Sequence, residues 1–269
     1  MMPLSLRFAG RELRGGVRGF RIFLACLALG VAAIAAAGST AEAFRRGLAS
    51  QASEILGGDL ALSIRQRQFS PAERAALEAQ GRVSYSVASM AMAEAASGER
   101  RLIELRGVSD SYPLAGKVTL QSGGSLQAAI ATTGGVAGAV VEQPLLDRLH
   151  MKVGDRFLAG NLPLVVRGVL MEEPDRLSRG FALGPRVIVN IGAVEQGGFM
   201  APGLPFGETA RVALRPGAPL EAAKTQLRTA LGGIVRIRDR EDAAPGIHRL
   251  IDQLEYFLGF IGLASLVAG

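Results

Sequence analysis

Cysteine and histidine are rare in this sequence of 269 residues, and tryptophan is absent. Cys26 is the single cysteine and lies inside an apolar run, so no disulfide can form within the chain and no metal–thiolate site is expected. The two histidines, His150 and His248, are far apart and lack the spacing of metal ligands. A structural zinc ion is therefore not predicted.

Catalytic motifs are also missing. Gly116 and Lys117 are followed by Val118 rather than Ser or Thr, so the sequence has no P-loop for ATP. No G-x-S-x-G motif occurs. The run Glu172-Glu173-Pro174-Asp175-Arg176 gathers carboxylates; we interpret it as a solvated turn after a strand, with a metal or acid–base role as the alternative. The sequence predicts no enzyme, no cofactor and no catalytic or metal-binding residue.

The positive charge is concentrated at the N-terminus. Residues 1–21 hold five arginines and Glu12, a net charge of +4, so the remainder carries only +2 of the total +6. A nucleic-acid-binding protein is expected to spread basic residues over a folded face, and nucleic acid is therefore not a predicted partner. Apolar residues interleave with the arginines, which indicates an amphipathic segment lying among anionic headgroups or docking a cytoplasmic partner.

An uncharged run follows at residues 22–41. Twenty residues of helix span about 30 Å, the thickness of a bilayer core, and the arginines before the run predict a cytoplasmic N-terminus. A cleavable signal peptide is the competing interpretation, because residues 35–41 are small. The run is longer than a usual signal-peptide core. We therefore favour a membrane anchor, with residues 42–245 outside the cytoplasm.

Helical periodicity continues beyond the uncharged run. Phe44, Leu48 and Ile55 recur at helical spacing until Gly57-Gly58, which predicts a stalk helix. Near the other end, Leu250, Leu254 and Phe257 trace one helical face. Residues 256–269 carry no charge but are too few to cross a bilayer, so we expect a second membrane helix that this chain truncates. A buried C-terminal helix of a soluble domain is the alternative.

The residues between the two stalks alternate short strands, helices and turns. Ser70-Pro71, with Glu73, forms a capping-box signature for a helix that closes at Gly81. Strand–helix–strand order occurs at both ends of this region, which predicts one split α/β layer with a β-rich insertion. The expected strands are 59–64, 83–94, 101–108, 209–214 and 234–238; the later helix is 220–231; the turns are Ser97-Gly98 and Pro216-Gly217.

Several motifs occur in an order that resembles FtsX-like permeases, closest to the YbbP-type branch predicted to export or extract lipophilic molecules. They are Arg11-Glu12-Leu13-Arg14, Phe20-Arg21-Ile22-Phe23-Leu24-Ala25, Leu56-Gly57-Gly58-Asp59-Leu60, Arg106-Gly107-Val108-Ser109-Asp110-Ser111-Tyr112-Pro113-Leu114, Lys152-Val153-Gly154-Asp155, Glu173-Pro174-Asp175-Arg176 and Phe257-Leu258-Gly259-Phe260-Ile261-Gly262-Leu263.

The resemblance implies a MacB-like periplasmic core domain that contains a split α/β "porter" region. The expected fold is α+β, with an N-terminal transmembrane helix and the start of a second. The predicted boundaries are a cytoplasmic basic amphipathic segment (1–21), transmembrane helix 1 (22–41), a stalk helix (42–58), a first porter-like α/β segment (59–133), a β-rich inserted subdomain (134–205), a second porter-like α/β segment (206–245), and a stalk with truncated transmembrane helix 2 (246–269).

The resemblance also implies partners and roles. It predicts a cytoplasmic ABC ATPase, the lipid bilayer, and a homodimer or a pseudo-dimer with a second permease half in a bacterial inner membrane. Carried over, Arg11, Glu12 and Arg14 would lie near the ATPase contact. Phe44, Leu48, Ile55, Leu250, Leu254 and Phe257 would form the stalks that transmit nucleotide-driven motion in lipid or lipoprotein export. Members of the family carry more spans, so this chain alone is not expected to transport.

Two other functions remain open from the sequence. The chain could be a membrane-anchored periplasmic binding or scaffold domain without transport activity. It could also be a secreted enzyme behind a signal peptide, although no catalytic motif supports that interpretation. The sequence does not name a substrate.

Overall fold

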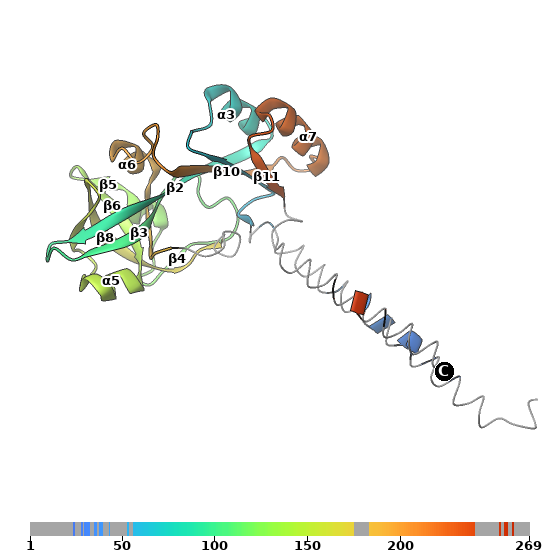
Figure 1. Cartoon of the computed structure of the whole chain (residues 1–269), viewed down its shortest axis with the longest axis horizontal. Helices are drawn as coiled ribbons and strands as arrows, with labels where there is room; N and C mark the ends of the chain where they lie inside the picture. Colours follow the sequence, from blue (N-terminus) through green and yellow to red (C-terminus); the bar gives the residue numbers. More distant parts are fainter. Residues whose placement is uncertain are drawn as a thin grey trace, which may run out of the picture. The chain divides into compact units, whose positions relative to one another are not determined.

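The computed structural model of the chain describes residues 56–174 and 183–239, together with single helical positions between residues 24 and 53 and between 253 and 260. The chain divides into two compact units. One consists of Met1–Ser50 and Pro245–Gly269, and the other is Gln51–Ala244, which contains every labelled element (Figure 1).

No helix within the described residues has the length and apolar character that a membrane span requires. The predicted membrane helix over 22–41 and the predicted stalks over 42–58 and 246–269 lie largely outside the described residues. They stay predictions.

The second unit has a mixed α/β fold, which confirms the predicted class in its coarse form. Its strands are β1 (Leu60–Arg65), β2 (Gly81–Ala95), β3 (Arg100–Val108), β4 (Thr119–Leu120), β5 (Thr132–Thr133), β6 (Val136–Glu142), β7 (Arg156–Ala159), β8 (Leu162–Glu172), β9 (Arg186–Asn190), β10 (Phe206–Leu214) and β11 (Arg236–Asp239). Its helices are α3 (Pro71–Glu78), α4 (Leu126–Ile130), α5 (Gln143–Leu149), α6 (Ile191–Gln196) and α7 (Leu220–Leu231).

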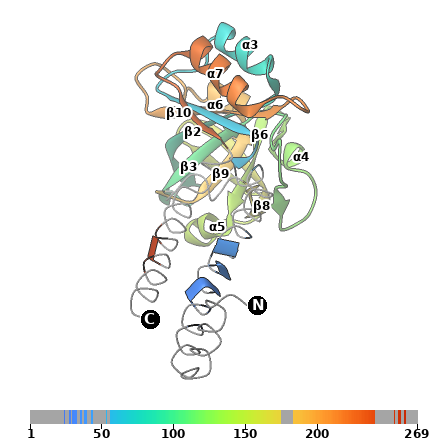
Figure 2. The ribbon, with the colours of Figure 1, turned by 90° about the vertical axis from the view of Figure 1, so that its right-hand side faces the viewer.

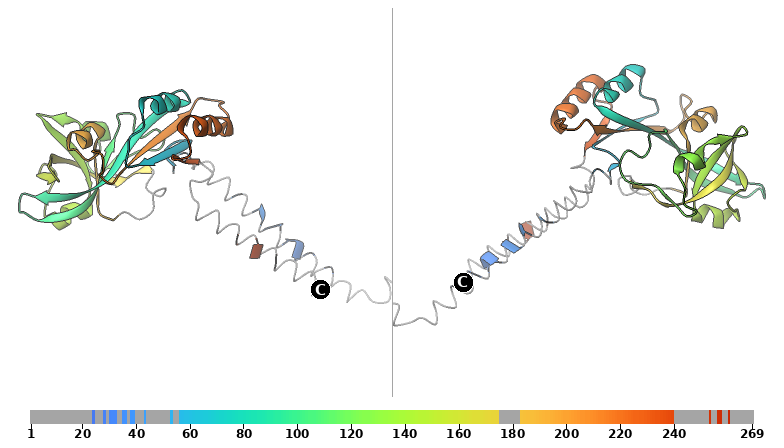
Figure 3. Two further views of the ribbon diagram at one scale, coloured as in Figure 1. Left: turned by 45° about the horizontal axis from the view of Figure 1, so that its top comes forward. Right: turned by 180° about the vertical axis from the view of Figure 1, so that it is seen from behind.

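One half of this unit is an antiparallel sheet covered by two helices. The strands lie in the order β11-β1-β10-β2, and α3 and α7 lie side by side over one face (Figures 1 and 3). Apolar residues alternate along each strand, so one set faces the helices and forms a core. The core contains Leu60, Leu62, Ile64, Leu77, Tyr85, Ala210, Val212, Ala223, Leu227 and Leu231.

The start of α3 confirms the predicted capping box. The side-chain oxygen of Ser70 accepts a hydrogen bond from the backbone N–H of Glu73, and the carboxylate of Glu73 accepts one from the backbone N–H of Ser70 at 2.7 Å. Pro71 occupies the first turn, where its missing N–H has no helical partner to lose. Both interactions are local, which is why the sequence alone can predict them.

The other half is a closed barrel. Successive pairings join β2 to β3, β3 to β9, β9 to β6, β6 to β8, β8 to β7, and β7 back to β2. Closure removes the free strand edges within this ring, and alternate side chains fill the interior. That interior includes Val87, Ile103, Leu105, Ala139, Val141, Phe157, Leu164, Val166, Val187 and Val189.

Strand β2 belongs to both halves. Its first section, Gly81 to Ser89, pairs with β10 of the helix-covered sheet, and its last section pairs with β3 and β7 of the barrel. The predicted hairpin around Ser97-Gly98 is therefore present, with Gly98 at a φ of +84°, but it runs from one half into the other. The segment after β3, with α4, covers the outside of the barrel (Figure 2) and packs Tyr112, Leu126 and Ile130 against it.

Candidate functional site

Most residues assigned to function from the sequence lie outside the described residues. These are Arg11, Glu12, Arg14, Phe44, Leu48, Ile55, Leu250 and Leu254. Phe257 is described as a helical residue that is 63% exposed. Their predicted roles stay predictions, and the structure instead draws attention to three places in the folded unit.

The first place is where the chain leads into β1. Gly57 has a φ of +79°, and the predicted end of the helix at Gly57-Gly58 is confirmed. The buried guanidinium of Arg211, in β10, donates hydrogen bonds to the backbone oxygen of Leu56 at 3.2 Å and to the hydroxyl of Ser86 at 2.9 Å. Arg211 thus ties Leu56, four residues before β1, to the middle of the sheet.

Asp59 adds a second tie at this position. Its carboxylate accepts hydrogen bonds from the hydroxyl of Ser53 at 3.2 Å and from the backbone N–H of Leu214 at 3.0 Å. Hydrogen bonds to an ionised group are stronger than neutral ones and are worth roughly 1.5–3 kcal/mol. The residues that lead into β1 are therefore anchored to the C-terminal end of β10.

The chain leaves the sheet next to where it enters. Leu60, at the start of β1, pairs directly with Asp239, at the end of β11. The carboxylate of Asp239 is 3% exposed and contacts the ammonium group of Lys224 in α7 at 2.5 Å. The hydrogen bond with Asp239 raises the pKa of Lys224 above its usual value. The two connections of the folded unit are thus fixed to adjacent strands.

The second place is a buried cluster of charges beside the barrel. The Glu173 carboxylate bonds the guanidinium groups of both Arg106 and Arg186, and the Tyr112 hydroxyl donates a hydrogen bond to it at 2.9 Å. The Arg106 guanidinium also lies 4.8 Å from the centre of the Tyr112 ring, and Arg186 reaches Glu104 at 3.5 Å. The side chains of Arg106 and Glu173 are fully buried.

This cluster corrects one sequence prediction. The sequence predicts a solvated turn from Glu172 to Arg176, and for Glu173 that prediction is wrong, because two buried guanidinium groups hold its carboxylate. Glu172 is exposed at the end of β8, while Asp175 and Arg176 lie outside the described residues. Within residues 56–174 and 183–239 no group of three or more His, Cys, Asp or Glu could hold a metal ion. The contacts of the cluster are those of a structural ion pair.

Two carboxylates in the helix-covered half, those of Glu73 and Glu208, have shifted pKa values. Paired hydrogen bonds with Arg67, each 2.7 Å long, lower the pKa of Glu73 to about 2. Burial raises the pKa of Glu208, although the backbone N–H of Phe69 at 2.6 Å and the guanidinium of Arg74 both favour its ionised form. The Arg74–Glu208 pair joins α3 to β10, and none of these groups lines the groove described next.

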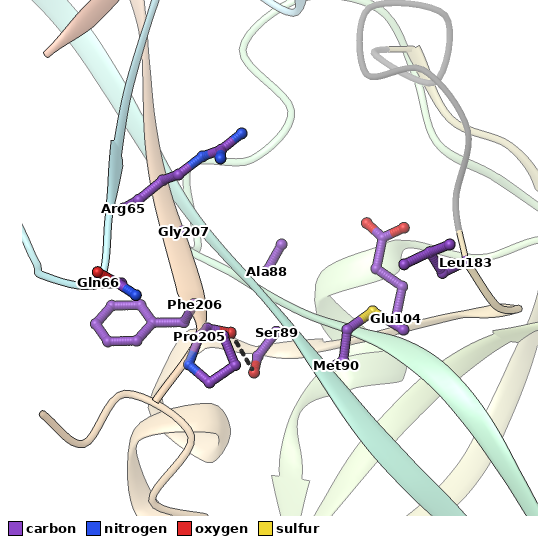
Figure 4. Close-up of a pocket in the computed structure, with 10 residues that line it drawn as sticks. All are labelled: Arg65, Gln66, Ala88, Ser89, Met90, Glu104, Leu183, Pro205, Phe206 and Gly207. Carbon is purple, nitrogen blue, oxygen red and sulfur yellow. Dashed lines mark hydrogen bonds between the residues drawn. The ribbon is translucent and has the colours of Figure 1, made fainter. Parts of the chain in front are cut away.

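The third place is a groove of about 570 Å³ between the two halves (Figure 4). Arg65 and Gln66 lie at one end and Glu104 and Leu183 at the other. Between them the lining is mostly apolar: Ala88, Ser89, Met90, Pro205, Phe206 and Gly207. The Ser89 hydroxyl already donates a hydrogen bond to the Pro205 oxygen at 3.4 Å. No sequence motif points to this groove, because strand pairing brings its walls together from segments that are far apart in the sequence.

The sequence matches the MacB-like periplasmic core domain over residues 22–230. The chain belongs to this family. Among curated proteins, it is 26% identical over 182 residues to the uncharacterized ABC transporter permease YbbP of Escherichia coli (strain K12). The match covers 66% of this chain and 21% of that protein, so this member of the family spans about a fifth of the length of its curated relative.

Two solved structures are similar to this family member. The periplasmic region of MacB from Actinobacillus actinomycetemcomitans is 12% identical, with a TM-score of 0.48 over 74% of this chain and 95% of that chain. The extracellular domain of the noncanonic ABC-type transporter YknZ from Gram-positive bacteria is 14% identical, with a TM-score of 0.44 over 67% of this chain and all of that chain.

Proposed function

We propose that this chain is the N-terminal portion of a permease subunit of an ABC-type system in a bacterial inner membrane. Family membership supports a permease-type role, since the curated relative is an ABC transporter permease. ATP hydrolysis belongs to a cytoplasmic partner. The described domain lies outside the cytoplasm and works as the moving element of an export or lipid-extraction system, in a dimer or with a second permease half.

Two segments connect the folded unit to the rest of the chain, one leading into β1 and one leaving β11. The proposal rests on how both are anchored to the sheet. Leu60 pairs with Asp239, so both connecting segments attach to adjacent strands. Arg211 and Asp59 fix the first segment, and Lys224 fixes the strand that leads to the second. Motion of these segments is then passed to the sheet as a whole, because a packed sheet resists deformation. Stalks over 42–58 and 246–269 would deliver that motion.

A purification experiment tests the partner. An affinity-tagged chain is isolated from its native membrane in mild detergent, and bound proteins are identified by mass spectrometry. An ABC ATPase is expected, and charge reversal in Arg11→Glu and Arg14→Glu reduces its recovery. Arg18→Glu is the matched control in the same basic segment and leaves recovery unchanged. Absence of any ATPase would contradict the proposal and favour an anchored binding or scaffold domain.

A labelling experiment tests the coupling. In a Cys26→Ser background, Ser97→Cys places a single thiol at the exposed hairpin turn between β2 and β3. ATP is expected to change the rate at which a thiol reagent modifies this position in the complex. Arg211→Met removes the hydrogen bonds to Leu56 and Ser86 and abolishes the change while ATP hydrolysis continues. Arg215→Met, at an exposed arginine in the turn between β10 and α7, is the control that keeps the change.

A further inference from the structure

The floor of the groove consists of small side chains. Arg65, Gly207 and Ala88 pair in one row across β1, β10 and β2, so they point to the same face of the sheet, opposite α3 and α7. Exposed sheet faces usually carry long polar side chains. Glycine and alanine at the centre of this row instead leave an open channel between Arg65 and the barrel.

The polar end of the groove has unused binding capacity. Within the residues that the structure describes, the Arg65 guanidinium has no ion pair or side-chain hydrogen bond. Its neighbour Gln66 has a φ of +60°, an uncommon conformation for a residue other than glycine. Such backbone conformations cluster at sites of function. The positive charge therefore faces the groove without a partner among the described residues.

At the other end, Glu104 pairs with Met90 across the sheet and its carboxylate is held by Arg186 at 3.5 Å. Beyond Glu104 the groove continues along β2 as an apolar stripe. Met90 lines the groove, and Met92 follows it on the same face of β2, where it is 45% exposed. Leu102 of β3 pairs directly with Met92 and is 44% exposed. Methionine side chains are flexible and polarizable, and they adapt to apolar ligands of varied shape.

The dimensions suit one acyl chain. Arg65 and Ala88 are separated by two strand spacings, about 10 Å, and Ala88 and Met90 by two residues of strand, about 7 Å. Together these distances are about 17 Å. One extended lipid chain spans one leaflet, which is half of a bilayer core of about 30 Å, so the two lengths are similar. A volume of about 570 Å³ lies within the range of small-ligand sites.

We infer that the groove binds an anionic single-chain amphiphile, such as a fatty acid or a lysophospholipid. The acidic headgroup pairs with Arg65, and the chain lies over Gly207 and Ala88 toward Met90 and Met92. As a cargo site this inference rests on the permease function proposed above. An extended peptide fits less well, because β10 is paired on both sides and offers no free edge for a further strand.

Binding is measured on the full chain in amphipol, with a dansyl-labelled fatty acid as the probe and no ATPase or nucleotide present. Arg65→Glu replaces attraction by repulsion and is expected to weaken binding about tenfold. It leaves the binding of a monoacylglycerol of equal chain length, measured by displacement of the probe, nearly unchanged. Gly207→Leu fills the floor, where a Cβ would meet only the Ile64 oxygen at 3.5 Å, and weakens binding of both ligands.

Arg156→Glu, at an exposed arginine of β7, is the matched control and keeps the wild-type affinity. Equal probe affinity in Arg65→Glu and the wild type would overturn the inference, as would unchanged binding in Gly207→Leu. Displacement of the probe by an uncharged apolar peptide but not by lysophosphatidylglycerol would assign the groove to peptides instead. Because the assay contains no ATPase, its failure leaves the permease proposal standing, and failure to recover an ATPase leaves this binding result intact.

Discussion

At the scale of single residues, buried charge is the feature with the largest consequences. Glu173 forms ion pairs with both Arg106 and Arg186 and accepts a hydrogen bond from Tyr112. A buried ion pair adds little net stability compared with apolar packing, but removing one partner leaves uncompensated charge in the protein interior. Glu173 is therefore a position where the folded state tolerates little change.

We predict that Glu173→Gln lowers the free energy of unfolding by about 3–5 kcal/mol. The measurement is urea unfolding of the full chain, followed by tyrosine fluorescence, which is a clean signal because the chain has no tryptophan. Glu172→Gln is the matched control at the neighbouring exposed carboxylate, with a change within about 0.5 kcal/mol. Equal effects of the two substitutions would mean that Glu173 is not buried between the two guanidinium groups.

A second prediction at this scale concerns pH. Arg67 lowers the pKa of Glu73 to about 2, so the folded state releases this proton more readily than the unfolded state. The pair therefore stabilises the fold above about pH 4.5, and that stability is lost as the pH falls toward 2. The wild type and Glu73→Gln are compared at several pH values. We expect the difference in their free energies of unfolding to shrink as the pH falls from about 4.5 to 2.

The expected loss is about 0.2–1 kcal/mol, because the pair is partly open to solvent. The control is the same comparison in an Arg67→Gln background. Removing the main cause of the shift should flatten the pH dependence there. A difference that grew on acidification would reverse the sign of the argument.

At the scale of helices and strands, local signals are predictable from the sequence and distant pairings are not. The capping box at Ser70 and the turn at Gly98 depend on neighbours within a few residues, and the structure confirms both. The return of β7 to β2 depends on pairs such as Ala93 with Ala159, which no local pattern encodes. The environment of Glu173 escapes prediction for the same reason, since one of its partners is 67 residues away in sequence.

Helix α6 provides a prediction at this scale, because it packs directly on a glycine of β3. A Cβ at Gly107 would lie 2.7 Å from a methyl carbon of Val194 and 3.0 Å from the Cα of Ile191. Gly107→Ala therefore forces α6 away from the barrel, and we expect it to cost about 1–3 kcal/mol of unfolding free energy.

Gly168→Ala, in β8, is the matched control. Its Cβ would meet Leu120 at 3.4 Å and Val140 at 3.5 Å, which are ordinary contacts. The alanine loses less backbone freedom on folding, so this change is expected to be neutral within about 0.5 kcal/mol or slightly stabilising. Thermal unfolding of the two variants checks the difference. The close packing of α6 on β3 would be refuted if Gly107→Ala proved as harmless as Gly168→Ala.

At the scale of the folded unit, the shared strand β2 links the helix-covered sheet to the barrel. Its pairing passes from β10 to β3 and β7 without a break, so neither half has a complete sheet without it. The two halves nevertheless have separate apolar cores, which is the condition under which subdomains unfold independently. Since β3 and the last section of β2 belong to the barrel, such a separation would cut β2 and would not fall at the predicted boundary at residue 134.

We predict that the shared strand β2 couples the two halves despite their separate cores. Gln51–Ala244 then unfolds as one cooperative unit. Leu227 of α7 is buried in the core of the helix-covered half, and Leu227→Ala should cost about 2–5 kcal/mol of unfolding free energy.

Tyr112 reports on the barrel half, and its fluorescence is isolated by replacing the other two tyrosines, Tyr85→Phe and Tyr256→Phe. In that background, Leu227→Ala should shift the Tyr112 transition and the circular-dichroism transition by the same amount of urea. Arg228→Ala, one residue along and exposed, is the control that moves neither. A Tyr112 midpoint that stays in place while circular dichroism becomes biphasic would instead establish the barrel as an independent subdomain.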